Sequence, residues 1–228
     1  DVIGWILFGV SCGCVCGVRS AGRVTLRFGS RTGMAAGCIL LLMGLPVLAA
    51  GLALQSTALA FLGLALFGAG TGWIDISINI EGAAFEQSSG QTIMTTLHGF
   101  FSFGTLCGAL LGMAMTALNI STALHFSLVF VIAVLMALMM WRQFPWSQPV
   151  EDEHAHKENY LTQVKAQLRD RRLLLLGVVI LAMALAEGSA NDWIPLLMID
   201  GHNFGAAAGT LIYVGFTAGM TAGRFLGG

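Results

Sequence analysis

Seven continuous apolar stretches run along the chain, separated by short polar or glycine-containing segments and one longer polar segment. They cover about residues 2–21, 33–54, 58–80, 93–118, 122–141, 173–199 and 206–223. Each is close to the roughly 20 apolar residues that a helix needs to cross a bilayer. The stretches do not alternate between apolar and polar residues, which favours helices over a membrane barrel. The pattern predicts an all-α membrane protein, a polytopic bundle of seven transmembrane helices.

The basic residues orient this bundle. All 11 Lys and Arg residues lie where a serially threaded bundle has connections on one side: at residues 19–31, at 142–172 and at Arg224. The opposite connections, near 55–57, 119–121 and 200–205, hold none. The positive-inside rule therefore predicts that the basic loops are cytoplasmic.

The longest polar segment predicts a division into domains. Residues 142–172 hold six basic and five acidic residues, and Tyr160, Val164 and Leu168 recur at the four-residue spacing of an amphipathic helix. We interpret this segment as a cytoplasmic linker that acts as a hinge between two bundles. Residues 1–141 would form an N-terminal bundle lacking its first helix, and residues 173–228 the first two helices of a C-terminal bundle. Both ends lie against apolar segments, so we expect a fragment of a longer protein.

The first and last spans share a glycine pattern. Glycines recur every fourth residue at positions 9, 13 and 17, and again at positions 215, 219 and 223. Both spans end in Ala-Gly-Arg, at Arg23 and at Arg224. Small residues at this spacing let two helices approach closely in lipid. Their recurrence in the same orientation predicts a parallel repeat of about 200 residues.

The composition excludes several classes of protein. Hydrophobic residues make up 56% of the chain and charged residues 10%, against roughly 25% charged in an average soluble domain. This excludes an ordinary soluble enzyme, and the net charge of −1 gives no field that favours nucleic acid. Cys12, Cys14 and Cys16 resemble a metal motif, but on a helix Cys14 faces away from the other two. We therefore expect no metal and no cofactor.

Two spans carry acids inside their apolar length, where a charge costs about 2.5–3.5 kcal/mol. In the span 58–80, Asp75 and Asn79 are four residues apart and share one face. They face either a polar cavity or a hydrogen-bonding neighbour helix. His98, near the cytoplasmic end of the next span, could relay protons with Asp75 if their helices are neighbours; the alternative is a histidine bonded to a carbonyl group.

The span 173–199 holds a second polar group. Glu187 is expected near the midplane, and Asn191 lies one turn further on the same face. A buried acid with a raised pKa can exchange protons near neutral pH, so Glu187 is a candidate for proton coupling or substrate binding. Asp192 is a candidate gate residue. Trp193 would either stack on a ligand ring or anchor the helix at the lipid interface.

Four segments carry a resemblance to a known family: residues 22–31, 68–86, 97–109 and 186–202. They are similar to the major facilitator superfamily, in particular to its fucose-permease-like branch and to bacterial inner-membrane members. The resemblance implies a twelve-helix transporter that works by alternating access, of which this chain would supply helices two to eight. It also implies that Asp75 takes the place of a fourth-helix carboxylate that acts in proton coupling.

The resemblance implies a gating loop between helices two and three. Its residues would be Gly22, Arg23, Arg27, Gly29 and Arg31, with Arg224 as the repeat counterpart. The chain departs from the family pattern at three positions: Leu26 replaces the usual Asp, Ser30 replaces the usual Arg, and Ala109 replaces the Pro of the antiporter motif. These departures remove the usual gating ion pair and the antiport signature.

The function expected is secondary active transport of a small polar solute such as a sugar, coupled to protons, by a monomer in a bacterial inner membrane. Its partners would be that solute, protons and the lipid bilayer. A seven-helix receptor is the alternative, although Lys157 and Lys165 both lie in the linker, which excludes an intramembrane retinal lysine. Because no His-Glu-x-x-His motif or Gly-x-Gly-Asp pair is present, we do not expect an intramembrane enzyme.

Overall fold

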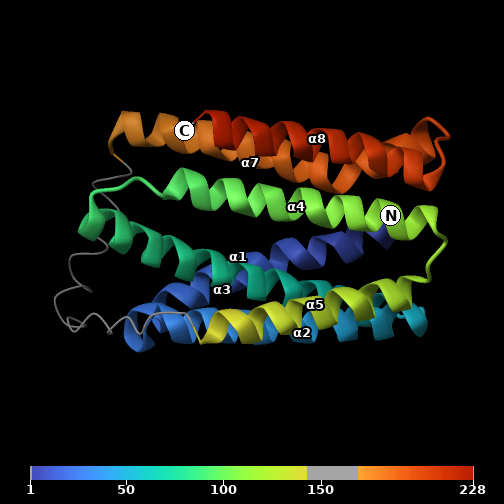
Figure 1. Cartoon of the computed structure of the whole chain (residues 1–228), viewed down its shortest axis with the longest axis horizontal. Coiled ribbons are helices and arrows are strands. Elements are labelled where there is room, and N and C mark those ends of the chain that lie inside the picture. Colours follow the sequence, from blue (N-terminus) through green and yellow to red (C-terminus); the bar gives the residue numbers. More distant parts are fainter. Residues whose placement is uncertain (1, 143–168, 228) are drawn as a thin grey trace.

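The computed structural model describes residues 2–142 and 169–227, and this part of the chain is helical with no strand (Figure 1). Its α-helices are α1 (Val2–Phe28), α2 (Ser30–Ala53), α3 (Thr57–Ser89), α4 (Met94–Ala117), α5 (Thr122–Trp141), α7 (Arg171–Leu196) and α8 (Ala206–Leu226). A π-helical turn, η1 (Leu197–Gly201), extends α7. The amphipathic helix expected around Tyr160, Val164 and Leu168 lies outside the described residues.

The helices confirm the all-α membrane class. Six of them, all except α8, are long and apolar enough to cross a membrane. The helix α8 has 21 residues, but glycines, threonines and Tyr213 interrupt its apolar sequence. The described residues therefore contain the seven predicted helices, and six of these helices meet the criterion of length and hydropathy for a membrane span.

Two helices extend beyond their apolar stretches. The first helix continues past residue 21 to Phe28, and the third continues past residue 80 to Ser89. Polar residues beyond the membrane do not break a helix, so each helix continues until a glycine takes a positive φ. Gly29 has φ 84° and Gly90 has φ 70°, values that cost a residue with a Cβ atom more than they cost glycine. The connection expected at residues 22–32 is therefore a single non-helical residue, Gly29.

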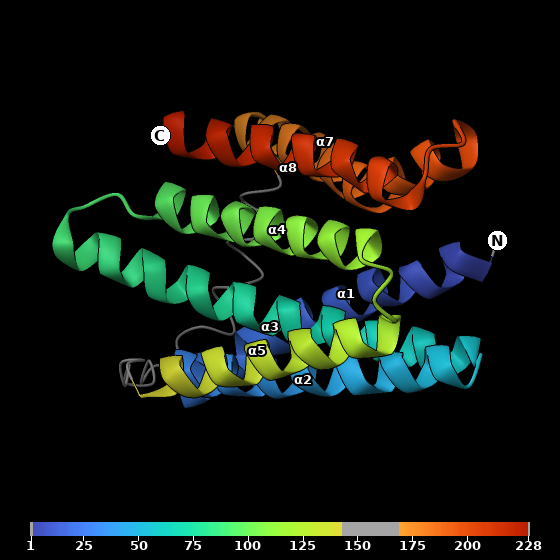
Figure 2. The same cartoon turned by 45° about the vertical axis from the view of Figure 1, so that its right-hand side comes forward.

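The helices form two groups, as Figures 1 and 2 show. In the first group α3 packs along both α1 and α2, and α5 packs beside α2. In the second group α4 packs along α8, and α7 also packs on α8. Although α4 comes from the N-terminal part of the chain, its main contact is with α8 across the linker. The contact between α4 and α8 is called the seam below.

Glycines bring α1 and α3 together. A methyl group at Gly9 would lie 2.7 Å from the carbonyl oxygen of Phe61, and one at Gly13 would collide with the carbonyl of Ala65. Gly17 meets Ala69 in the same way. The three glycines therefore contact carbonyl groups that are also four residues apart, and the predicted packing role of this stripe is confirmed.

The run Gly68-Ala-Gly-Thr-Gly72 serves both neighbours of α3. Gly68 and Gly72 lie against the backbone of α1, while Gly70 lies against Gly37 and Leu41 of α2. The prediction that these glycines thin the helix for a neighbour is confirmed. With its flanks in contact with α1 and α2, α3 holds the next turn, which carries Asp75, in a defined orientation.

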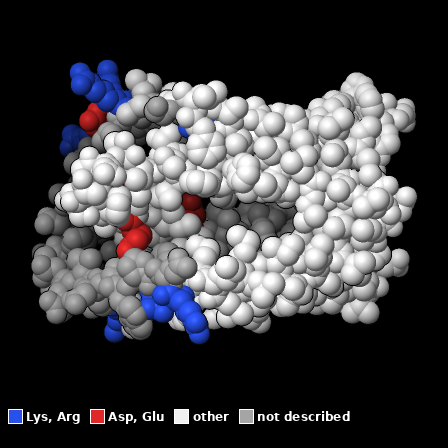
Figure 3. Space-filling view, viewed as in Figure 1, with Lys and Arg blue, Asp and Glu red and all other residues white. Residues whose placement is uncertain are grey.

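On one face of the bundle, the charged residues lie toward one end. On the face shown in Figure 3, the charged side chains lie toward one end, and the opposite end shows none. That opposite end carries tight turns, in which Gln55 and Asn119 take φ of 51° and 52°. Ser56, one residue after Gln55, and Ser121, two residues after Asn119, cap the following helices. This separation is the arrangement that the basic residues predict.

We expect Gly13→Ala to destabilise the protein by about 1–3 kcal/mol, because the added methyl group forces α1 away from α3. The measurement is the thermal unfolding midpoint of the purified protein in detergent. Gly219→Ala is the matched control: a methyl group at that helical glycine meets no atom within 4 Å. Equal shifts of the midpoint in the two variants would contradict the packing role.

We expect the charged end to face the cytoplasm. A cysteine introduced at exposed Gln55 should react with a membrane-impermeant maleimide in intact cells, whereas one at exposed Gln91 should react only after permeabilisation. The parent protein with its own five cysteines gives the background. The reverse labelling pattern would overturn the orientation.

Candidate functional site

The first polar site lies on α3. The Asn79 amide donates to the Asp75 carboxylate at 3.1 Å and to the Asp75 carbonyl at 2.9 Å, which confirms that the two side chains share a face. Asp75 is exposed, since the glycine-lined flanks of the helix contact α1 and α2 instead. Within the described residues no Lys, Arg or His forms an ion pair with Asp75. Its carboxylate is therefore open to a proton or a solute.

Hydroxyl groups and Glu81 support this site from the neighbouring turns. Ser77 is fully buried, donates to the Trp73 carbonyl at 2.8 Å and lies 3.5 Å from the Thr25 hydroxyl of α1. One turn further on, Glu81 accepts a hydrogen bond from Ser30 in the first turn of α2. A carboxylate there also complements the positive end of the α2 dipole. Glu81 therefore has a structural role at the contact between α3 and α2.

All the predicted gating-loop residues except Gly29 lie on helices. Arg23 and Arg27 are exposed, with the Arg27 guanidinium 5.3 Å from the Phe28 ring centroid. Arg31 lies 4.5 Å from the Trp141 ring centroid and donates to the Trp141 carbonyl at 3.2 Å. This contact ties the first turn of α2 to the end of α5. Gly22 has open space around it, whereas Gly29 makes the turn.

The second polar site joins three helices. Glu187 of α7 accepts a hydrogen bond from Arg224 of α8 at 2.8 Å, and this is the single ion pair among the described residues. The other terminal nitrogen of Arg224 donates to the Ser102 hydroxyl of α4. Arg224, expected in a gating loop, is thus inside α8 and directed at the acid that the sequence singles out on α7. Sequence reasoning found both charges but not their pairing.

The remaining residues of α7 separate into two groups. Asn191 accepts a hydrogen bond from the Tyr213 hydroxyl of α8 at 3.2 Å. Asp192 and Trp193 are exposed. The side chain of Trp193 lines a pocket of about 1070 Å³ whose walls are mostly apolar. Asn191 therefore belongs with the Glu187 group, and Trp193 with the pocket.

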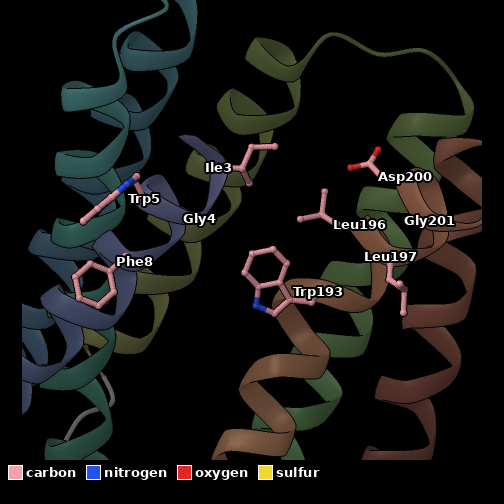
Figure 4. A pocket seen from close by; sticks show the side chains of 9 residues that line it. All are labelled: Ile3, Gly4, Trp5, Phe8, Trp193, Leu196, Leu197, Asp200 and Gly201. Atoms are coloured by element: carbon pink, nitrogen blue, oxygen red, sulfur yellow. The ribbon is translucent and has the colours of Figure 1, made fainter. Parts of the chain in front are cut away.

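The pocket lies between the start of α1 and the end of α7 (Figure 4). It is lined by Ile3, Gly4, Trp5, Phe8, Trp193, Leu196, Leu197, Asp200 and Gly201. Ile3 and Trp193 face each other across it, while Trp5 and Phe8 point away from Trp193, so the three aromatic rings do not form a cage. Asp200 at its rim is the one charged residue of the lining.

His98 does not join Asp75 in this structure. Its side chain is exposed, and among the described residues no hydrogen bond links it to an acid. Its backbone carbonyl accepts the hydroxyl of Ser102 at 3.1 Å. The relay between His98 and Asp75 requires neighbouring helices, and the main contact of α4 is with α8 instead.

Ser102 and Tyr213 are the polar residues that sequence reasoning missed. Ser102 is fully buried in the seam. A lone hydroxyl inside an apolar run gives little signal, because serine commonly bonds to the carbonyl four residues before it. Ser102 makes that bond as well, and only the packing of α8 against α4 brings Arg224 to it.

Removing both members of the ion pair should destabilise the protein by less than the sum of the two single removals. We expect Glu187→Ala or Arg224→Ala to lower the free energy of unfolding by about 1–3 kcal/mol, because each leaves its partner without a charged hydrogen bond. The double variant should lose less than the sum of the two. Thermal unfolding in detergent measures the cycle, with Asp192→Ala as the control on the same helix. Additive losses would contradict the pairing.

Comparison with known proteins places these sites in a family. The family model "Major Facilitator Superfamily" matches residues 1–228. An uncharacterized MFS-type transporter of Yersinia pestis is 26% identical over 231 residues, covering 99% of this chain and 56% of the relative. An uncharacterized transporter of Sinorhizobium fredii is 29% identical over 178 residues, covering 78% of this chain and 45% of the relative.

A third relative is the membrane protein MosC of Rhizobium meliloti, 25% identical over 165 residues, which cover 72% of this chain and 38% of that protein. The chain spans about half the length of the curated relatives it matches. No solved structure matches it. Because the family model covers the chain from its first residue to its last, the chain belongs to the Major Facilitator Superfamily of membrane transporters.

Proposed function

We propose that this protein takes part in secondary active transport of a small polar solute such as a sugar, coupled to protons and working by alternating access. The observation that carries the proposal is one carboxylate within the apolar length of each group of helices, Asp75 on α3 and Glu187 on α7. Acids at such depth are rare in membrane helices and mark substrate or proton pathways.

Asp75 is the better candidate for a proton acceptor. It is exposed, and its hydrogen-bonding partner is a neutral amide, that of Asn79. A carboxylate without a cation favours protonation when water leaves its surroundings. In the proposed cycle, Asp75 takes up a proton on one side of the membrane and releases it on the other.

Glu187 differs because its charge is compensated. Arg224 contacts one carboxylate oxygen at 2.8 Å, so the charge of Glu187 is balanced while the pair is intact. The two acids thus have different environments. Unequal pairs of this kind are a common basis for dividing proton and substrate roles between two residues.

Neutral polar groups near the two acids suit a hydroxyl-rich solute. Asn79 and Asn191 offer amide donors and acceptors, and Tyr213 offers a hydroxyl. Trp193 and Asp192 are exposed on the same helix as Glu187. A few convergent polar groups on an otherwise apolar wall are typical of small-molecule sites. Figure 3 shows a hollow between the two groups of helices, where such a solute would pass.

The seam supports alternating access. Its buried residues are small: Gly99, Ser102 and Ala109 on α4, and Val214, Thr217 and Thr221 on α8. Small side chains interlock less deeply than large ones, so two helices can slide or tilt with little loss of packing. We propose that residues 1–141 and 173–228 belong to the two moving halves, with residues 142–172 as the hinge and the basic loops in the cytoplasm of a bacterium.

The relatives support transport without indicating a substrate. Two of them carry the word transporter in their names, and none is named as a receptor. Because the chain spans about half their length, the solute, the proton coupling and the monomeric state are proposals for the complete gene product.

The test is uptake into proteoliposomes that contain the complete gene product, with an inward proton gradient and a panel of radiolabelled sugars and small acids. We expect Asp75→Asn and Glu187→Gln each to lower gradient-driven uptake at least tenfold, by about 1.4 kcal/mol or more of coupling free energy. Asp170→Asn is the control, because Asp170 caps α7 outside the apolar stretch and Asn caps a helix equally well.

Uptake that is unchanged in both acid variants would make Asp75 and Glu187 structural residues and overturn the proton-coupling proposal. Gradient-driven uptake lost in one variant alone would assign the coupling to that acid.

A further inference from the structure

We propose that Arg224 couples the protonation state of Glu187 to the packing of the seam. While Glu187 is ionised, Arg224 holds α4 through Ser102. When Glu187 is neutral, Arg224 releases α4. The proposal adds Arg224 and Ser102 to the transport cycle as coupling residues. Its use in transport rests on the proposed function, but the contact itself is testable without any solute.

The first support is the geometry of the guanidinium group. One terminal nitrogen of Arg224 contacts Glu187 at 2.8 Å, and the other donates to Ser102. The group is planar and its donors are fixed relative to one another. The carboxylate on one side therefore sets the direction of the hydrogen bond on the other side.

The second support is the position of Ser102. This serine is fully buried, and its hydroxyl donates to the His98 carbonyl at 3.1 Å, so its oxygen is left to accept from Arg224. Ser102 lies about 12 Å along α4 from the first residue of that helix, at 1.5 Å per residue. A cation at this depth is costly unless it is paired. The contact of Arg224 with Ser102 is therefore stable only while Glu187 balances the charge of Arg224.

The third support is a second location for the guanidinium. Arg224 also lines a small polar pocket of about 130 Å³, together with Thr92, Thr95, Thr96 and Phe225. This pocket lies at the start of α4, toward the charged end of the molecule, where a long side chain can reach water. Phe225 contacts Gly99 and Phe100 of α4 beside it. A neutral Glu187 would let Arg224 turn into this pocket and leave the seam.

Other charged or titratable groups near the pair do not replace Glu187. Asp192 lies on the same helix, Tyr213 lies on α8 and bonds to Asn191, and His98 on α4 is exposed. Among the described residues, Glu187 is the one acid within ion-pair distance of Arg224.

The experiment measures the spacing of α4 and α8 in the complete gene product, without solute. Spin labels on non-canonical amino acids at exposed Gln91 and Leu226 report that spacing and leave the native cysteines in place. Glu187→Gln imitates the neutral acid, and Ser102→Ala removes the acceptor in the seam. We expect each to raise the population of the wide spacing about tenfold, the effect of losing one charged hydrogen bond.

The matched control is Thr105→Ala. Thr105 lies on the same helix and bonds to the carbonyl four residues before it, as Ser102 does, but it is half-buried and forms no hydrogen bond to the described residues of α8. We expect no change of spacing in this variant. Arg224→Lys keeps the charge but replaces the fork with a single ammonium group, so it should resemble Ser102→Ala.

The decisive comparison is the double variant. Ser102→Ala should have no further effect in the Glu187→Gln background, because Arg224 has already left the serine. Equal effects of Ser102→Ala in both backgrounds, or an unchanged spacing in Glu187→Gln, would overturn the proposal. Unchanged proton-driven uptake in Asp75→Asn and Glu187→Gln, with the expected spacing response, would instead count against the proposed function alone.

Discussion

The close contact of α3 with α1 and α2 is the constraint on which the first group of helices depends. Lipid supplies no hydrophobic drive for helices to associate, so they associate through van der Waals packing and short backbone contacts. Gly13 on α1 and Gly70 on α3 allow this approach, since a methyl group at either position would overlap the partner backbone. Their effect reaches the polar site, because both flanks of α3 are occupied and Asp75 is left on the open face.

The second group of helices follows a different principle. In the seam between α4 and α8, Ser102 and Thr217 are fully buried, and Arg224 crosses from α8 to both α7 and α4. Polar contacts of this kind have direction and a defined partner, whereas packing against glycine depends on shape alone. The molecule thus combines one group held by backbone contact with a junction held by a charge, and a charge can be removed by one proton.

The two acids show what can and what cannot be predicted from single residues in the sequence. Asp75 and Asn79 are correctly placed on one face by their spacing alone, because the α-helix has a fixed period. The sequence shows Glu187 as an unusual charge in an apolar span, but the partner of Glu187 is 37 positions away in the chain. The spacing of residues along the sequence contains no information about such a pair. Likewise, the sequence predicts that Gly9, Gly13 and Gly17 pack against a helix. It does not predict that this helix is α3, whose carbonyl groups they contact.

Local chemistry in the sequence determined the helices, their approximate limits, the charged end and the candidate acids, because hydropathy and helical period act over a few residues. The apolar stretch does not show where α1 ends, since no local signal before Gly29 stops that helix. The tertiary structure alone decided that α4 lies on α8, that Arg224 points at Glu187 and Ser102, and that His98 stays apart from Asp75. These outcomes depend on which helices become neighbours, and that choice is made by the summed packing of whole faces.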